Sequence, residues 1–240
     1  MPILLLAAVQ GGAISNSCRP VPLAMPELLT IAGVQQAERQ LSRHPGLAEL
    51  ISRHGPCPIT PLPGVQPWLA LCSAVIHQQL AGRAAAAIEA RFRNRLGTAP
   101  VPAGVLALSD DDLRGTGLSR QKAAAIRDIA ARAASGFLPD RTEADRLTDD
   151  ELVSRLTAAR GVGRWTVEMF LIFTLGRPDV WPVDDYGVRR GWCVIEANPG
   201  LPRARELLHW GEAWRPWRSV LAWYLWRAAE DGSTGAPAAQ

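Results

Sequence analysis

Apolar residues along this chain recur mostly at the three- and four-residue spacing of amphipathic helices, and strand-type alternation flanked by hairpin turns is absent. Residues 26–44 show this spacing after an opening proline, which is favoured in the first turn of a helix. The pattern predicts an all-α fold. Further helices are expected over 68–96 with an interruption near Gly82, from 110, over 119–136 and 152–159, from 165, from 186, and over 201–208 and 216–229.

Polar residues mark several of these helix starts. Ser109 and Ser119 stand at the N-cap positions of two predicted helices, and Thr148 with Glu151 forms a capping box. A segment rich in Pro and Gly at 55–64 is the best candidate for a linker between an N-terminal piece and the main helical body. The nine residues after Asp231 have the composition of a disordered tail.

Length and composition fit a soluble globular protein. The 240 residues suffice for a buried core in one domain or two small lobes, and no apolar run reaches the roughly 18 residues of a membrane span. The net charge of +3 is only mildly basic and identifies no partner. Lys122 is the only lysine, so every other permanently charged basic side chain is arginine, a bidentate phosphate donor. Codon usage in a GC-rich genome explains the same bias.

The cysteines and the N-terminus bear on the cellular compartment. The four cysteines are scattered without metal-ligand spacing, which predicts free thiols in a reducing compartment. The apolar N-terminus lacks the positively charged region of a signal peptide. A disordered extension over 1–24, or translation from Met25, fits its composition better. We therefore expect a cytoplasmic protein.

The stretch from 156 to 186 carries the strongest functional pattern. A helix ending near 160 is followed by a Gly-x-Gly turn at 161–163, an apolar helix from 165, and a loop that delivers Asp184 and Asp185. Such a turn leaves backbone N–H groups free at the start of the second helix, which suits a phosphate. The triplet alone is found in many helix connections. The capped helix before it and the aspartates after it favour a binding site.

Taken together, the motifs resemble the helix-hairpin-helix/Gly-Pro-Asp superfamily of DNA glycosylases over roughly residues 60 to 230. Within that superfamily the chain is most similar to the 3-methyladenine DNA glycosylase II (AlkA-like) branch. The resemblance implies a two-lobed helical enzyme with a helix-hairpin-helix motif at 152–176 and a cleft between the lobes. It is carried, in order, by IHQQLAGRAA at 76–85, GVGRWT at 161–166, RPDVWPVDDYGVRR at 177–190 and WRPWRSVLAWYLWR at 214–227.

The resemblance implies that Asp185 is the catalytic carboxylate. In the family an aspartate follows the hairpin tryptophan by twenty residues, and Asp185 stands in that relation to Trp165. Other branches place it one residue earlier, at Asp184, which we expect instead to cap or brace the helix that begins near Tyr186. A fixed anion stabilises the oxocarbenium-like transition state of base release.

The resemblance also implies a base pocket made of Trp165, Met169 and Trp226. Met169 stands where some members carry tyrosine, and a place in the core is as good an assignment for Trp226. Lyase-type relatives carry a nucleophilic lysine at the position of Trp165, so a monofunctional enzyme that leaves an intact abasic site is expected. The face of Trp165 attracts a cationic alkylated base.

Residues 77–80, which we expect to be helical, match the family stretch that reaches the DNA minor groove. Gln79 is the preferred wedge to fill the gap left by a flipped base, with Gln78 and Leu80 beside it; the alternative is an exposed polar turn. The expected contacts to the DNA backbone come from Gly161, Gly163, Arg164 and Trp165. The family also implies a monovalent cation, Na+ or K+, held by the main-chain carbonyls of Thr157, Ala159 and Val162.

The expected organisation is an extension at 1–24, N-terminal helices at 25–64 packing with the C-terminal lobe, a central lobe at 65–183, C-terminal helices at 184–231 and a tail at 232–240. A nucleoid-associated monomer acting on alkylated bases in double-stranded DNA is expected, with no required cofactor and no iron–sulfur cluster. Two other functions stay open. One is a glycosylase for oxidised or mismatched bases. The other is a non-catalytic helix-hairpin-helix DNA-binding module, which would gain nothing from the anion of Asp185.

Overall fold

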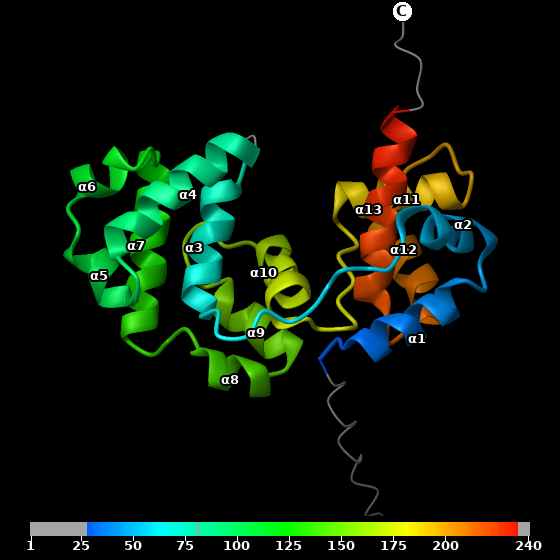
Figure 1. Cartoon of the computed structure of the whole chain (residues 1–240), viewed down its shortest axis with the longest axis horizontal. Coiled ribbons are helices and arrows are strands. Elements are labelled where there is room, and N and C mark those ends of the chain that lie inside the picture. Colours follow the sequence, from blue (N-terminus) through cyan, green and yellow to red (C-terminus); the bar gives the residue numbers. More distant parts are fainter. Residues whose placement is uncertain (1–27, 81, 235–240) are drawn as a thin grey trace, which may run out of the picture.

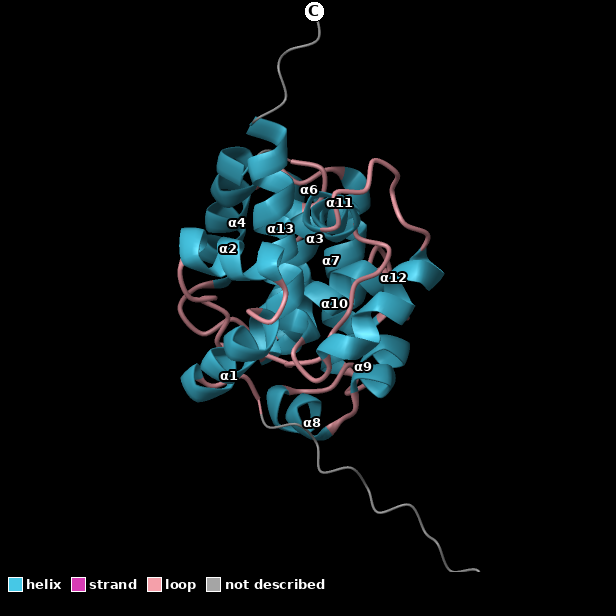
Figure 2. Cartoon of the chain, turned by 90° about the vertical axis from the view of Figure 1, so that its right-hand side faces the viewer, coloured by secondary structure: helices cyan, strands magenta, loops and turns pink. Residues whose placement is uncertain are grey.

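The computed structural model describes residues 28–80 and 82–234, which form helices and loops without a strand (Figure 2). The all-α prediction is therefore confirmed. No helix in this part of the chain combines the length and apolar character needed to cross a membrane. The predicted extension at 1–24, the proline-opened start at 26 and Cys18 lie outside the described residues. The helices are α1 (Ile31–Leu41), α2 (Pro45–His54), α3 (Pro67–His77), α4 (Gly82–Leu96), α5 (Pro102–Ala107), α6 (Asp110–Gly115), α7 (Arg120–Ala134), α8 (Arg141–Arg146), α9 (Asp149–Leu156), α10 (Arg164–Phe170), the π-helical turn η1 (Leu171–Leu175), α11 (Tyr186–Ile195), α12 (Ala204–Gly211), the 3-10 turn η2 (Glu212–Trp214) and α13 (Arg218–Thr234).

The helices form two lobes (Figure 1). The hairpin lobe, residues 67–175, contains α3 to α10 and η1, with α7 packed against α3 and α5, and α10 against α3 and α9. The terminal lobe, residues 31–54 and 186–234, is organised around α13, which packs against α1, α2 and α11. Because α1 and α2 precede the hairpin lobe and α11 follows it, both ends of the described chain build the terminal lobe.

The connector at 176–185 is bound to both lobes. Arg177 is buried, and its guanidinium donates hydrogen bonds to the carbonyls of Ala144 (3.1 Å) and Leu147 (2.8 Å) in the hairpin lobe. The Arg177 carbonyl accepts a hydrogen bond from the Ser219 hydroxyl of α13 at 2.6 Å. These bonds hold the connector in place, and with it the position of Asp185 between the lobes.

The capping predictions are confirmed. The Ser109 and Ser119 hydroxyls accept hydrogen bonds from the backbone N–H groups of Asp112 and Lys122, and Thr148 forms a reciprocal capping box with Glu151. These contacts involve residues three apart in sequence, so local sequence determines them. The predicted interruption before Gly82 is also present, because α3 ends at His77 and α4 begins at Gly82.

Several predicted helix bounds were wrong. The first helix begins at Ile31, because the Thr30 side chain accepts a hydrogen bond from the Gly33 N–H and so caps it there. Helices α2, α5 and α8 were not predicted. Helix α9 ends at Leu156 instead of 159, with Thr157 as its C-cap. Helix α13 continues to Thr234, so the predicted tail at 232–240 is helical over its first three residues.

Candidate active site

The turn between α9 and α10 presents backbone N–H groups at a helix start. Gly161 has φ +77°, in the left-handed region, which turns the chain between the two helices. Gly163 is the N-cap of α10 and has no side chain to occupy the first N–H groups. These groups, with the helix dipole, favour an anion such as a DNA phosphate. Arg164 and Trp165, both exposed, follow directly.

Asp185 ends the connector between the lobes, and its carboxylate is held by three N–H donors. Its Oδ2 accepts a hydrogen bond from the Trp165 indole at 2.7 Å. Its Oδ1 accepts one from the Trp226 indole at 2.8 Å and one from the Val188 backbone at 2.8 Å. Donors from α10, α11 and α13 therefore fix both oxygens, so the carboxylate is anchored by both lobes.

The expected division of labour between the two aspartates was wrong in one respect. Asp185, not Asp184, is the N-cap of α11, through its bond to the Val188 N–H. Asp184 is exposed. Capping uses Oδ1 of Asp185, whereas Oδ2 faces the Trp165 indole, so the capping role and a chemical role are compatible in one side chain.

Three aromatic rings lie beside this carboxylate. Trp165 is 48% exposed, which leaves a ring face available to a ligand. Trp226 stacks on Phe173 with ring centroids 5.6 Å apart and 28° between planes. Met169 is half-buried against the core. The sequence did not single out Phe173, which is 39% exposed although it belongs to an apolar run.

Phe173 lies in the π-helical turn η1, which inserts about one extra residue into the helix that begins at Arg164. Its ring stacks on Trp226, whose indole donates to Asp185. The sequence carries no local signal for this insertion.

The predicted wedge segment is a turn, not a helix. Helix α3 ends at His77, and Gln79 has φ +54°, in the left-handed region. The Gln78 amide donates to the Gly161 carbonyl at 3.1 Å and lies 3.4 Å from the Thr166 hydroxyl. Gln78 is therefore engaged with the hairpin, while Gln79 and Leu80 are exposed.

Two of the three hairpin carbonyls expected to bind a cation accept no hydrogen bond from the described residues. The Ala159 carbonyl accepts a hydrogen bond from the Val162 N–H at 3.1 Å. The carbonyls of Thr157 and Val162 accept none from the part of the chain that the structure describes. Free carbonyl oxygens are suitable donors for a hard cation, so these residues fit one.

The described cysteines, Cys57, Cys72 and Cys193, are buried free thiols, and burial raises the pKa of the Cys57 thiol to about 12.

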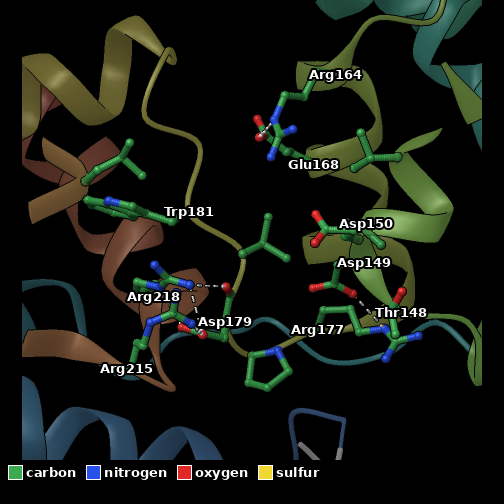
Figure 3. Close-up of a pocket in the computed structure, with 15 residues that line it drawn as sticks. Thr148, Asp149, Asp150, Arg164, Glu168, Arg177, Asp179, Trp181, Arg215 and Arg218 are labelled. Atoms are coloured by element: carbon green, nitrogen blue, oxygen red, sulfur yellow. Dashed lines mark hydrogen bonds and ion pairs between the residues drawn. The ribbon is translucent and has the colours of Figure 1, made fainter. Parts of the chain in front are cut away.

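A hollow of about 420 Å³ lies between the lobes (Figure 3). Most of its charged side chains are paired: Asp179 binds Arg218 at 2.6 Å and Arg215, and Arg177 lies 3.4 Å from Asp149. Neither Asp185 nor Trp226 lines it. These ion pairs bind the connector at 176–185 to both lobes.

Glu168 is a buried carboxyl at the edge of this hollow. It is 6% exposed and accepts a hydrogen bond from Arg164 Nε at 2.9 Å. Burial, and secondarily the negative charges of Asp184 and Asp185, raise its pKa above the ordinary value, against the lowering effect of Arg164. The sequence pattern did not single out Glu168, which follows three residues after Trp165 in a largely apolar helix.

We expect Glu168→Gln to stabilise the protein at neutral pH. Because the folded pKa is raised, the folded state binds the proton more tightly than the unfolded state, and stability falls as pH rises above about 4.5. The neutral glutamine lacks this penalty. The melting temperature of the variant should be a few degrees above that of the wild type at pH 7, equivalent to about 1 kcal/mol of stability. At pH 4 the two melting temperatures should be equal.

Glu49→Gln is the matched control, because Glu49 also pairs with an arginine four residues away but is 69% exposed. It should melt like the wild type at both pH values. A Glu168→Gln variant that melts below the wild type at pH 7 would show that the Arg164 ion pair outweighs the burial of the charge.

The known proteins that are similar to this chain in sequence and in structure include DNA glycosylases. Residues 72–216 match the family of HhH-GPD superfamily base excision DNA repair proteins. The DNA-3-methyladenine glycosylase 1 of Schizosaccharomyces pombe is 39% identical over 167 residues, which cover 69% of this chain and 73% of that protein.

Two solved structures have the same fold and substantial sequence identity. An S. pombe 3-methyladenine DNA glycosylase in complex with abasic DNA superposes with a TM-score of 0.70 at 36% identity, covering 81% of this chain and 97% of that one. A DNA-3-methyladenine glycosidase from Bacillus halodurans superposes with a TM-score of 0.72 at 32% identity, covering 83% and 91%.

Proposed function

Because the chain belongs to the HhH-GPD superfamily of base excision DNA repair proteins, we propose that it is a monofunctional glycosylase of the 3-methyladenine type II class. It is a base excision repair glycosylase for alkylated bases. The proposal adds that it acts by hydrolysis alone and works as a monomer on duplex DNA. The observation that carries it is the Asp185 carboxylate, held by three N–H donors beside the exposed ring of Trp165.

The chemistry follows from this arrangement. Base release develops positive charge on the sugar, and a preoriented carboxylate stabilises that charge more than it stabilises the neutral ground state. Asp185 also orients or deprotonates the attacking water. An alkylated base that is already cationic leaves without a general acid, and the faces of Trp165, Phe173 and Trp226 attract it by cation–π contact worth about 1–2 kcal/mol.

The absence of lyase chemistry rests on the position of the only lysine. Schiff-base chemistry requires an amine that can reach the sugar. Trp165 stands at the hairpin position, and the Lys122 ammonium donates to the carbonyls of Ile76 and Gln78. Lys122 is therefore engaged at the end of α3 and does not contact Asp185.

The remaining contacts bind the DNA. The N–H groups of Gly161, Gly163 and Trp165, with Arg164, hold a phosphate, and a monovalent cation on the carbonyls of Thr157, Ala159 and Val162 would add positive charge there. Gln79 and Leu80, the exposed residues of the turn at 78–80, enter the base stack at the position that the flipped base has left.

Base release from a duplex containing methylated purines tests the proposal. We expect free methylated purine, identified by mass, and an abasic strand that breaks only after alkali treatment. Strand breakage without alkali, or trapping of the protein on DNA by borohydride, would contradict the monofunctional assignment. Tight DNA binding without release would favour the non-catalytic module, and release only from an oxidised or mismatched duplex would favour the other specificity.

A further inference from the structure

The only lysine of the chain lies at the C-terminal end of α3. Lys122 is in the first turn of α7, where the Ser119 cap fixes the backbone. Its Nζ donates to the Ile76 carbonyl at 2.8 Å and to the Gln78 carbonyl at 2.7 Å. The last carbonyls of a helix lack partners within the helix and carry the negative end of its dipole. The half-buried ammonium supplies both the missing donors and the opposite charge.

The residue that receives this lysine also binds the hairpin. Gln78 accepts from Lys122 through its carbonyl and donates through its side chain to the Gly161 carbonyl at 3.1 Å. Gln78 thus links α3 and α7 to the turn that is expected to hold the DNA phosphate. These are contacts between segments 44 and 83 residues apart in sequence.

Gln79 and Leu80, which follow Gln78, are exposed. Gln79 adopts φ +54°, a conformation that residues other than glycine rarely occupy, and its side chain is exposed. Leu80 is 40% exposed. An uncommon backbone conformation persists when the surrounding structure imposes it, and such conformations gather at functional sites.

We infer that Lys122 is a positioning residue for the wedge turn, residues 78–80. By closing the end of α3 it holds Gln79 and Leu80 ready to enter the base stack while the hairpin holds the phosphate. This inference rests on the proposed function. Preorganisation removes from the flipping step the cost of ordering the turn, so Lys122 acts on base extrusion and leaves the chemistry at Asp185 untouched.

A lysine suits this role better than an arginine. Its compact ammonium directs separate N–H bonds to two carbonyls that lie two residues apart, whereas a guanidinium offers its donors in one plane. The chain uses arginine for every other permanently charged basic side chain, and its single lysine stands where two carbonyls are bound by one ammonium.

Single-turnover base release by Lys122→Met tests the inference on two duplexes. One carries a methylated purine opposite its normal partner, and the other carries it opposite a tetrahydrofuran abasic analogue, which lowers the cost of extrusion. We expect a loss on the order of tenfold to a hundredfold on the first duplex, since two charge-assisted hydrogen bonds are removed. On the second duplex the loss should be about threefold or less. The rate of base release by Lys122→Arg on the first duplex should lie between the rates of the wild type and Lys122→Met.

Gln121→Met is the control, because Gln121 is an exposed neighbour on the same helix, and it should match the wild type. Equal losses by Lys122→Met on both duplexes, or no loss on either, would overturn the inference. Circular dichroism melting establishes that each variant is folded. If Lys122→Met does not fold, the comparison of the two duplexes with Lys122→Arg decides in the same way.

A binding measurement separates this inference from the proposed function. A duplex with 2-aminopurine next to a tetrahydrofuran site becomes more fluorescent when a side chain enters the stack, and it requires no chemistry. Lys122→Met should give a smaller increase than the wild type at saturating protein. The double variant Lys122→Met/Gln79→Ala should give a fluorescence increase only slightly smaller than that of Gln79→Ala alone, because both substitutions act on the same turn. Failure of the wild type to release any base would reject the proposed function and leave this measurement to decide on Lys122.

Discussion

Asp185→Asn is expected to lower base release from alkylated duplex DNA by roughly 10²–10³-fold or more, the loss typical when an electrostatic stabiliser of a transition state is removed. Asparagine is nearly isosteric and is itself a good N-cap, so α11 keeps its start at the Val188 N–H. What it loses is the negative charge. Its amide nitrogen also places a donor against one of the two indole N–H groups that Asp185 now accepts.

The same variant should bind DNA as well as the wild type or more tightly. Removing an anion beside a bound phosphate backbone reduces repulsion. Single-turnover release and fluorescence anisotropy with a tetrahydrofuran duplex measure the two quantities separately.

Asp184→Asn is the matched control for this experiment, because Asp184 is exposed and is not the N-cap of α11. We expect it to release base within a few-fold of the wild type. If Asp184→Asn were inactive and Asp185→Asn active, the catalytic carboxylate would be Asp184. If both kept full activity, the carboxylate mechanism itself would be wrong.

The second large effect concerns stability and arises where α11 meets α13. A Cβ placed on Gly191 would lie 2.5 Å from the Leu225 carbonyl carbon and 2.8 Å from its Cα, and closer still to the carbonyl oxygen. These are backbone atoms of a buried helix, so no side-chain rotation relieves the overlap. Gly191→Ala should therefore destabilise the protein by on the order of 3 kcal/mol or more, measured by urea unfolding.

Gly104→Ala provides the comparison. Gly104 lies within α5, and a Cβ there would make only an ordinary 3.7 Å contact with Leu96. Alanine has the higher helix propensity, so this variant should be unchanged or more stable by about 0.5–1 kcal/mol. A Gly191→Ala variant as stable as Gly104→Ala would show that α11 and α13 can separate without cost.

The contrast between predicted and unpredicted features follows the range of the interactions involved. The caps at Ser109, Ser119 and Thr148 depend on contacts between residues three apart, and they were predictable. Helices α2, α5 and α8 were missed because they are short, with 10, 6 and 6 residues, and offer few periods of the apolar pattern. The available signals were a proline in the first turn of α2 and of α5 and the N-cap Asp140 of α8.

The candidate site was predictable as a set of residues and not as a geometry. The resemblance to the glycosylase family implied Trp165 and Asp185. It did not indicate that Asp185 would serve as the cap, since either aspartate suits an N-cap. Phe173 depended on a π turn, and the bond from Gln78 to Gly161 joins residues 83 apart in sequence. Neither feature leaves a trace in a local pattern.

The construction of the terminal lobe from both ends of the described chain has a consequence for biosynthesis. Residues 67–175 are contiguous, so the hairpin lobe has all its helices once that stretch has left the ribosome. Helices α1 and α2, by contrast, bury Leu41 and Leu47 in a lobe organised around α13, which is made last. At about 5–20 residues per second they wait roughly ten to forty seconds for that partner. Their apolar faces are accessible to chaperones during this interval, and completion of α13 both closes the lobe and supplies the Trp226 indole that binds Asp185.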